Sequence, residues 1–251
     1  MQALPLDWPL PGGVRAFCST RSGGVSAAPW DTLNLGDHVG DEAAAVAENR
    51  RRYAHALGAR PLFLQQVHGT GVERLDPQAT DGTVADACWT MERGIACTII
   101  VADCLPILFA AEGVVAAAHA GWRGLAAGVL EALWENFWPE VADTPQRAAT
   151  ATTVWLGPCI GPDAFEVGPE VKAAFEAAQP AAARRFRQGA PGKWLADLPN
   201  LARDRLSALG LAGVHGNDGG TGWCTVSDPS RFFSHRRDRR SGRFAASIWL
   251  V

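Results

Sequence analysis

Three short strand-like runs, each followed within two residues by a histidine or a cysteine, constrain the fold of this chain more than any other feature. The runs cover residues 62–67, 95–102 and 114–118. Their length and their turn-forming flanks are typical of strands, and the continuous run at 95–102 is typical of a strand that is buried on both faces. The sequence therefore predicts a covered sheet with ligand-type residues at the strand ends.

Helical spacing and further apolar runs predict the remaining elements. We expect helices over 42–57, 125–137, 169–178 and 198–209, and strands over 154–156 and 244–251, the last of which closes the sheet. Asp41 is the expected N-cap of the first helix, and Gly58 is its expected end. Residues 179–193 are expected to form a surface excursion. The pattern predicts one layered α/β domain with a mixed β-sheet over residues 1–251.

The charge balance excludes two classes of partner. The formal net charge is -3, so we expect neither a nucleic-acid partner nor a membrane partner. The N-terminus lacks the features of a signal peptide, and no apolar run approaches the roughly 20 residues of a membrane helix. We expect a cytoplasmic protein that is a monomer or a homodimer. The six cysteines contain no C-x-x-C pair, and all except Cys104 are expected to be buried thiols.

His68, Cys104 and His119 are the residues that follow the three apolar runs. Strand ends in layered α/β domains are where pockets form. Imidazole and thiolate ligands suit zinc, with copper as the alternative, and three protein ligands leave a coordination position open for chemistry. The sequence predicts a catalytic metal site. It contains no Walker phosphate loop, no G-x-G-x-x-G, no H-E-x-x-H and no G-x-S-x-G motif.

Several motifs resemble those of one known family. The central ones are Leu-Gln-Gln-Val-His-Gly at 64–69, Ala-Asp-Cys-Leu-Pro at 102–106 and Ala-His-Ala-Gly-Trp-Arg-Gly at 118–124. Further matches lie at 20–26, 33–36, 157–161, 165–168, 223–225, 232–238 and 242–243. The chain resembles the "multicopper polyphenol oxidase" or "laccase domain" proteins, described as purine nucleoside phosphorylases and also called the peptidoglycan-editing-factor family. Many relatives carry tyrosine where this chain has His235.

The resemblance implies a three-layer α/β/α domain with a mixed β-sheet. It also implies zinc on His68, Cys104 and His119, phosphorolysis of adenosine, inosine and 5'-methylthioadenosine, and deamination of adenosine. The laccase activity itself is not expected, because six histidines without an H-x-H pair cannot build a blue-copper site and a trinuclear cluster. A single copper site with two histidines and one cysteine stays open.

Phosphorolysis needs groups that bind an anion and move protons. Arg21, beside the Gly23-Gly24 turn, offers a guanidinium and backbone amides for phosphate, and we expect this turn to line the metal pocket. We assign catalytic roles to Cys104, His119 and Arg21. Substrate-binding roles are expected for Arg21, Gly23, Gly24, Asn34, Arg123 and Arg236, and outer-shell or proton-transfer roles for Asp103 and His38.

Two other classes of function stay open. Cys104 could be the nucleophile of a hydrolase with His119 as its base, without a metal. This reading fits an enzyme that edits peptidoglycan precursors. The other alternative is a non-catalytic module that binds a metal or a nucleoside.

Overall fold

The strands form two larger mixed sheets and a small antiparallel one in the computed structural model, which describes residues 1–251. The four-stranded sheet has the order β1 (Val14–Cys18), β13 (Phe244–Leu250), β5 (Ile95–Val101), β2 (Arg60–Phe63). The six-stranded sheet has the order β12 (Gly213–Gly216), β8 (Thr153–Leu156), β6 (Leu105–Ala111), β7 (Val114–Ala120), β4 (Ala87–Thr90), β3 (Val72–Arg74). The small sheet has the order β10 (Phe186–Gln188), β11 (Trp194–Ala196), β9 (Glu166–Val167).

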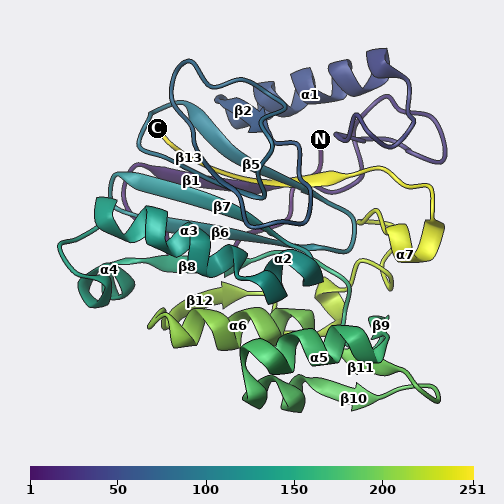
Figure 1. The fold of residues 1–251 in the computed structure, drawn as a ribbon. Coiled ribbons are helices and arrows are strands. Elements are labelled where there is room, and N and C mark those ends of the chain that lie inside the picture. The colour runs from purple at the N-terminus through teal and green to yellow at the C-terminus, as the bar shows by residue number, and fades with distance from the viewer.

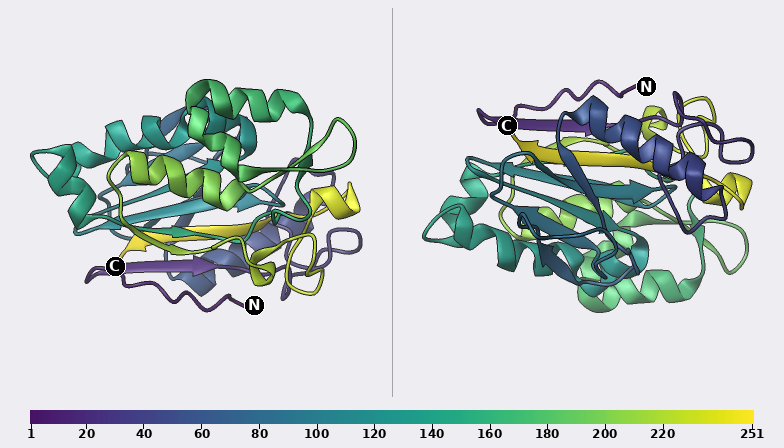
Figure 2. Two further views of the ribbon diagram at one scale, coloured as in Figure 1. Left: turned by 90° about the horizontal axis from the view of Figure 1, so that it is seen from below. Right: turned by 90° about the horizontal axis from the view of Figure 1, so that it is seen from above.

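Helices cover the outer faces of both larger sheets (Figure 1, Figure 2). Helix α1 (Ala43–Leu57) lies over the four-stranded sheet. The helices on the other side are α2 (Trp122–Ala127), α3 (Val129–Phe137), α4 (Pro145–Ala151), α5 (Pro169–Ala178) and α6 (Leu198–Ala208). The short helical segments are α7 (His235–Asp238), η1 (Trp138–Glu140), η2 (Pro180–Arg185) and η3 (Thr221–Trp223). No helix combines the length and the apolar character needed to cross a membrane.

The two larger sheets pack face to face, and this divides the core. In β5, Cys97 and Ile99 face the six-stranded sheet, whereas Ile100 packs on the side of α1. In β6, Leu108 lies between the sheets and Ile107 packs under the helices. Strand β5 is thus buried on both faces, as predicted. The predicted α/β class with mixed pairing is confirmed, and the β layer between the helices is two sheets thick.

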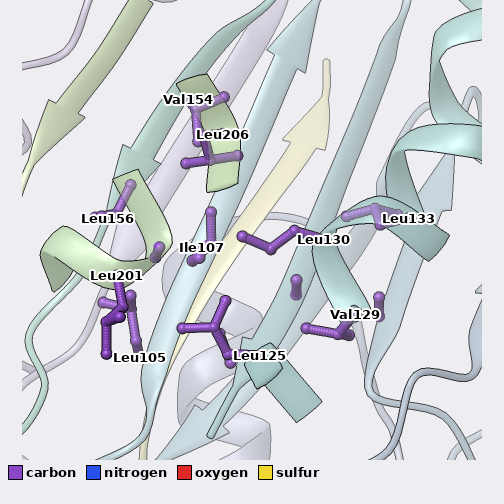
Figure 3. Packing of buried hydrophobic residues seen from close by; sticks show 14 of the residues in the cluster. Leu105, Ile107, Leu125, Val129, Leu130, Leu133, Val154, Leu156, Leu201 and Leu206 are labelled. Carbon is purple, nitrogen blue, oxygen red and sulfur yellow. The ribbon is translucent and has the colours of Figure 1, made fainter. Parts of the chain in front are cut away.

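The largest apolar cluster lies between the six-stranded sheet and its helices (Figure 3). Side chains from α2, α3 and α6 pack there on those of β6 and β8, and the labelled ones are Leu105, Ile107, Leu125, Val129, Leu130, Leu133, Val154, Leu156, Leu201 and Leu206. Burying one such side chain fully contributes about 1.5–3 kcal/mol. This packing fixes β6 and β7, which lie beside the site described below.

The predicted helices are found with two corrections. Helix α1 ends at Gly58, whose φ of 63° is left-handed as a C-cap requires. Asp41 is not its N-cap, because the helix begins at Ala43 with Glu42 as the capping residue; the Asp41 carboxylate accepts hydrogen bonds from Ser26, Asn34 and the Glu42 backbone N–H. The helix expected over 125–137 is two helices, since Gly128, with a φ of 101°, ends α2 before α3 begins.

Four expectations were wrong. The strand expected over 62–67 is β2, which ends at Phe63. Strand β7 continues through His119 to Ala120, and strand β6, which was not predicted, follows Cys104 directly. Strand β13 lies between β1 and β5 and does not close an edge. Residues 179–193 hold η2 and β10, where Ala182 and Phe186 are buried, so they are more than a surface excursion.

Candidate metal centre

The three predicted ligands meet at one end of the paired sheets. His68 follows β2, Cys104 lies in the short link that carries the chain from β5 to β6, and His119 lies near the end of β7. Their ligand atoms all lie within 4.8 Å of one another. The link from β5 to β6 also joins the two larger sheets, so residues from both sheets contribute to the site.

The buried carboxylate of Asp86 orients two of these residues. Its Oδ1 accepts hydrogen bonds from His119 Nδ1 at 2.8 Å and from the His68 backbone N–H at 2.9 Å. Its Oδ2 accepts from the backbone N–H groups of Gly69 at 2.6 Å and Val67 at 3.2 Å. Bonding at Nδ1 leaves the Nε2 of His119 for a ligand. Sequence reasoning missed Asp86, because no local pattern links it to a histidine 33 residues away.

Glycines give the donors room to converge. A Cβ atom at Gly121 would lie 2.6 Å from His68 Cδ2 and 3.0 Å from Cys104 Sγ. A Cβ atom at Gly124 would lie 2.7 Å from the Gly69 carbonyl oxygen. The spacing of the Ala-His-Ala-Gly-Trp-Arg-Gly motif therefore has a steric cause, because glycine allows the close approach at both positions.

Cys104 and His119 carry complementary charge. Burial alone would raise the pKa of the Cys104 thiol, but the charge and the hydrogen bonds of His119 and His68 lower that pKa to about 6. Burial alone would lower the pKa of His119, but the Cys104 thiolate and the Asp86 carboxylate raise it to about 9. Thiolate is the form of cysteine that both binds metals and attacks carbonyl carbons.

The donor set fits a zinc ion. Tetrahedral zinc, with bonds of about 2.3 Å to sulfur and about 2.0 Å to nitrogen, separates these two donors by about 3.5 Å. Cys104 Sγ lies 3.6 Å from His68 Nε2. His68 and His119 are set edge to face, with ring centroids 4.7 Å apart. The donors are thus arranged as a zinc site needs, with the metal identity open between zinc and copper.

A cavity of about 390 Å³ opens over these residues. Its apolar wall comes from Ile100, Val101, Ala102, Trp122, Ile160, Phe165 and Leu198. Its polar wall comes from His38, Gln66, Asp103, Arg123, His235, Arg236, Arg239 and Arg243. The cavity therefore combines aromatic and aliphatic surface with a concentration of arginines beside the metal-ligand residues.

Four predicted residues besides the ligands line this cavity. Arg123 is exposed, with its guanidinium carbon 4.5 Å from the centre of the Trp122 ring, and Arg236 donates to the carbonyl of Glu166 at 3.0 Å. The side chain of His38 lies partly accessible beside Asp37, and its partial burial, followed by the charge of Arg243, lowers its pKa.

The fourth, Asp103, is occupied by structural hydrogen bonds. Its carboxylate accepts from Thr225 Oγ1 and from the Arg236 backbone N–H, each at 2.6 Å. Asp103 therefore fastens the C-terminal segment to the cavity. With both oxygens bonded in this way, its arrangement favours this structural role over proton transfer.

The expectation that Arg21 and the glycine turn line the same cavity was wrong. Arg21 bonds to the Asp31 and Pro229 carbonyls and forms an ion pair with the Asp31 carboxylate at 3.2 Å. The backbone N–H groups of Gly23 and Gly24 donate to the Thr32 hydroxyl at 3.0 and 3.1 Å. Because these donors already have partners, the turn does not present them to an anion.

Asn34 also lies outside the cavity lining and is fully buried. Its side chain donates to Gly36 and Asp41 and accepts from the backbone N–H groups of Gly36 and Arg243. With every polar atom bonded inside the protein, Asn34 has nothing left for direct substrate contact.

Backbone strain marks the cavity as well. The non-glycine residues with positive φ are His68 at 60°, Asp103 at 91° and Arg239 at 61°, and all three line it. Strained backbone of this kind clusters at functional sites. Arg239 and Arg243, which also line the cavity, were not among the residues predicted from the sequence.

A family model described as multi-copper polyphenol oxidoreductase laccase matches residues 15–251. The chain belongs to this family. A family relative from Pseudomonas aeruginosa, named as a purine nucleoside phosphorylase, is 53% identical over 250 residues, or 98% of each chain. Purine nucleoside phosphorylase YfiH of Escherichia coli is 47% identical and covers 98% of this chain and 97% of its own length. The assignment made from the motifs is confirmed.

Solved structures agree with this family assignment. Protein NMB0706 of Neisseria meningitidis has a TM-score of 0.90 at 43% identity and covers 99% of this chain and 98% of its own. YlmD of Geobacillus stearothermophilus has a TM-score of 0.85 at 32% identity, covering 95% and 92%. The arrangement of the two larger sheets is therefore that of solved family structures.

Proposed function

We propose that this protein is a zinc-dependent purine nucleoside phosphorylase. The observation that carries the proposal is the convergence of His68, Cys104 and His119 at a cavity lined by arginines and aromatic residues. The relatives named as purine nucleoside phosphorylases, 53% and 47% identical over nearly the whole chain, support it. The substrates we propose are adenosine, inosine and 5'-methylthioadenosine, with inorganic phosphate.

The ligand residues would hold one metal ion. His68, Cys104 and His119 would bind it, and Asp86 would hold His119 in the tautomer that presents Nε2. A bound zinc ion supplies a Lewis acid and lowers the pKa of a bound water to about 7. We propose one metal per chain, since only one cluster of three donor residues is found. We propose zinc in preference to copper. The elemental analysis described below identifies the bound metal.

The cavity walls offer surfaces that bind the purine nucleoside and the phosphate. Aromatic and aliphatic side chains such as Phe165 and Trp122 offer flat surface to a purine base and apolar surface to a 5'-methylthio group. The arginines that line the same cavity offer positive charge to phosphate. Holding phosphate against the anomeric carbon of a bound nucleoside converts a bimolecular reaction into a positioned one.

The test is a phosphate-dependent assay with product analysis. Incubation of the purified protein with inosine and phosphate should release hypoxanthine and ribose 1-phosphate, and omission of phosphate should stop the release. Elemental analysis of the same sample should find about one zinc per chain. Ammonia release from adenosine tests deamination separately. A protein that binds nucleoside without turnover would instead be the non-catalytic module.

A second candidate function rests on the chain of contacts from Asp86 through His119 to Cys104. A thiolate with an oriented imidazole is the arrangement of a cysteine hydrolase, and it would suit the editing of peptidoglycan precursors. The position of His68 supports the metal site, because a metal would use it and a Cys–His pair would not. Under the zinc proposal, chelation should abolish activity and make Cys104 react with iodoacetamide. Full activity in metal-free protein would favour the hydrolase.

A further inference from the structure

The guanidinium of Arg243 faces the cavity without a carboxylate partner. The residue is half-buried, lines the cavity, and forms no ion pair within 4 Å. One of its terminal nitrogens donates to the Ser241 and Gly242 carbonyls at 2.9 and 3.0 Å. The other terminal nitrogen and Nε make no hydrogen bond to the protein. A guanidinium removed from water in this way is normally paired with an anion.

The two negative groups that act on Arg243, those of Cys104 and Asp103, already have other roles. Burial lowers the pKa of Arg243, and the charges of Cys104 and Asp103 oppose that shift. Both Asp103 oxygens accept hydrogen bonds from other partners. Cys104 belongs to the ligand set. Among the residues that line the same cavity, His38 adds a hydrogen-bonding imidazole and Arg239 adds positive charge.

The motif Leu-Asn-Leu-Gly at 33–36 sets the position of Arg243. Asn34 Oδ1 accepts a hydrogen bond from the Arg243 backbone N–H at 2.9 Å, and the Leu35 N–H donates to the Arg243 carbonyl at 2.9 Å. A Cβ atom at Gly36 would lie 2.7 Å from Arg243 Cγ. The motif thus clamps the backbone of Arg243 and leaves space for its side chain, and Asn34 acts on the cavity through it.

We propose that Arg243 anchors a binding site for inorganic phosphate beside the metal ligands, that His38 and Arg239 complete this site, and that Asn34 and Gly36 position its arginine. The two nitrogens without protein partners match the bidentate binding of a phosphate by arginine. The proposal rests on the proposed phosphorolysis and deepens it, because it assigns the co-substrate to named residues that differ from those expected from the sequence.

The first experiment measures phosphate binding without turnover. Thermal melting of the metal-free protein with increasing inorganic phosphate should show stabilisation that Arg243→Gln removes and Arg240→Gln keeps. Arg240 is the matched control, since its guanidinium stacks on Trp30 outside this cavity. A nucleoside 5'-monophosphate serves as competitor. If it stabilises the protein and inorganic phosphate does not, the site accepts phosphate only as part of a nucleotide and the proposal is overturned.

The second experiment is kinetic. Arg243→Gln should raise the KM for phosphate about 10- to 100-fold, with a smaller change in the KM for nucleoside. Arg243→Lys, which keeps the charge and loses the bidentate geometry, and Gly36→Ala should raise the same KM less. If Arg243→Gln does not fold, these two variants carry the test. An unchanged KM for phosphate in folded Arg243 variants overturns the subsite, whereas phosphate-independent wild-type protein overturns phosphorolysis alone.

Discussion

Asp86 joins four hydrogen-bond donors to one carboxylate, namely the His119 ring and the backbone N–H groups of residues 67–69. It therefore sets both the tautomer of one ligand and the left-handed backbone of another. Carboxylates behind metal-binding histidines raise metal affinity by about 10- to 100-fold.

We expect Asp86→Asn to weaken zinc binding by about that factor, because an amide offers only one acceptor oxygen in place of two. Competition titration against a chromophoric chelator measures the affinity. Asp81→Asn is the control, since Asp81 lies outside the cavity. Equal affinities of Asp86→Asn and wild-type protein would show that the carboxylate does not support the ligands.

Gly121→Ala should reduce zinc occupancy. Its new methyl group would overlap His68 and press on Cys104, so the three donors could not converge. Gly222→Ala is the matched control, because its Cβ atom would meet nothing within 4 Å and its φ is not left-handed. Metal content after gel filtration, compared with the melting temperature, separates the two effects. Full occupancy in Gly121→Ala would contradict the steric argument.

At the scale of elements, α2 and α3 pack on the six-stranded sheet (Figure 3). Neither helix contributes a metal ligand. Gly128, with its left-handed backbone, separates the two helices. Fold stability and metal binding should therefore be separable along α3, none of whose residues lines the cavity.

Leu133→Ala, in α3, should lower the free energy of unfolding by about 2–5 kcal/mol, since Leu133 is fully buried in the cluster. Zinc affinity of the folded protein should be unchanged. The exposed Glu135→Ala on the same helix should stay within about 0.5 kcal/mol of wild type. Urea unfolding measures both values. A loss of zinc affinity in folded Leu133→Ala would tie the helix to the site.

The elements that sequence reasoning predicted well are those with a local cause. Helix α5 matches its predicted bounds, and the apolar run at 95–102 is the doubly buried β5. Residues placed by distant partners were missed or misplaced. Asp86 and Arg243 owe their roles to segments far along the chain, and Arg21 looked free only because its partners Asp31 and Pro229 were unknown. The three ligands were predicted because each follows or ends a visible apolar run.

At the scale of the whole molecule, the metal site lies across the link between the two larger sheets. A ligand that binds only the folded protein stabilises it by about 2.7 kcal/mol at 100 times its Kd. That residues 1–251 form a single domain stays a prediction. A single cooperative unfolding transition would support it.

Zinc at that excess should therefore raise the melting temperature by roughly 5–10 °C. Cys104→Ser should show little of this rise, because a ligand is lost. Calorimetry of the chelated and zinc-loaded proteins gives both values. An equal rise in wild type and Cys104→Ser would mean that zinc acts elsewhere on the protein.

Strand β13 enters between β1 and β5, two strands made much earlier in synthesis (Figure 1). Until residues 244–250 leave the ribosome, β1 has no partner in its sheet, and its edge and the apolar face beside it are open to other chains. Arg243 stands immediately before this strand. The same insertion that joins β1 to β5 thus brings the arginine to the cavity, and a nascent chain cannot bind phosphate there before its hydrophobic core is complete.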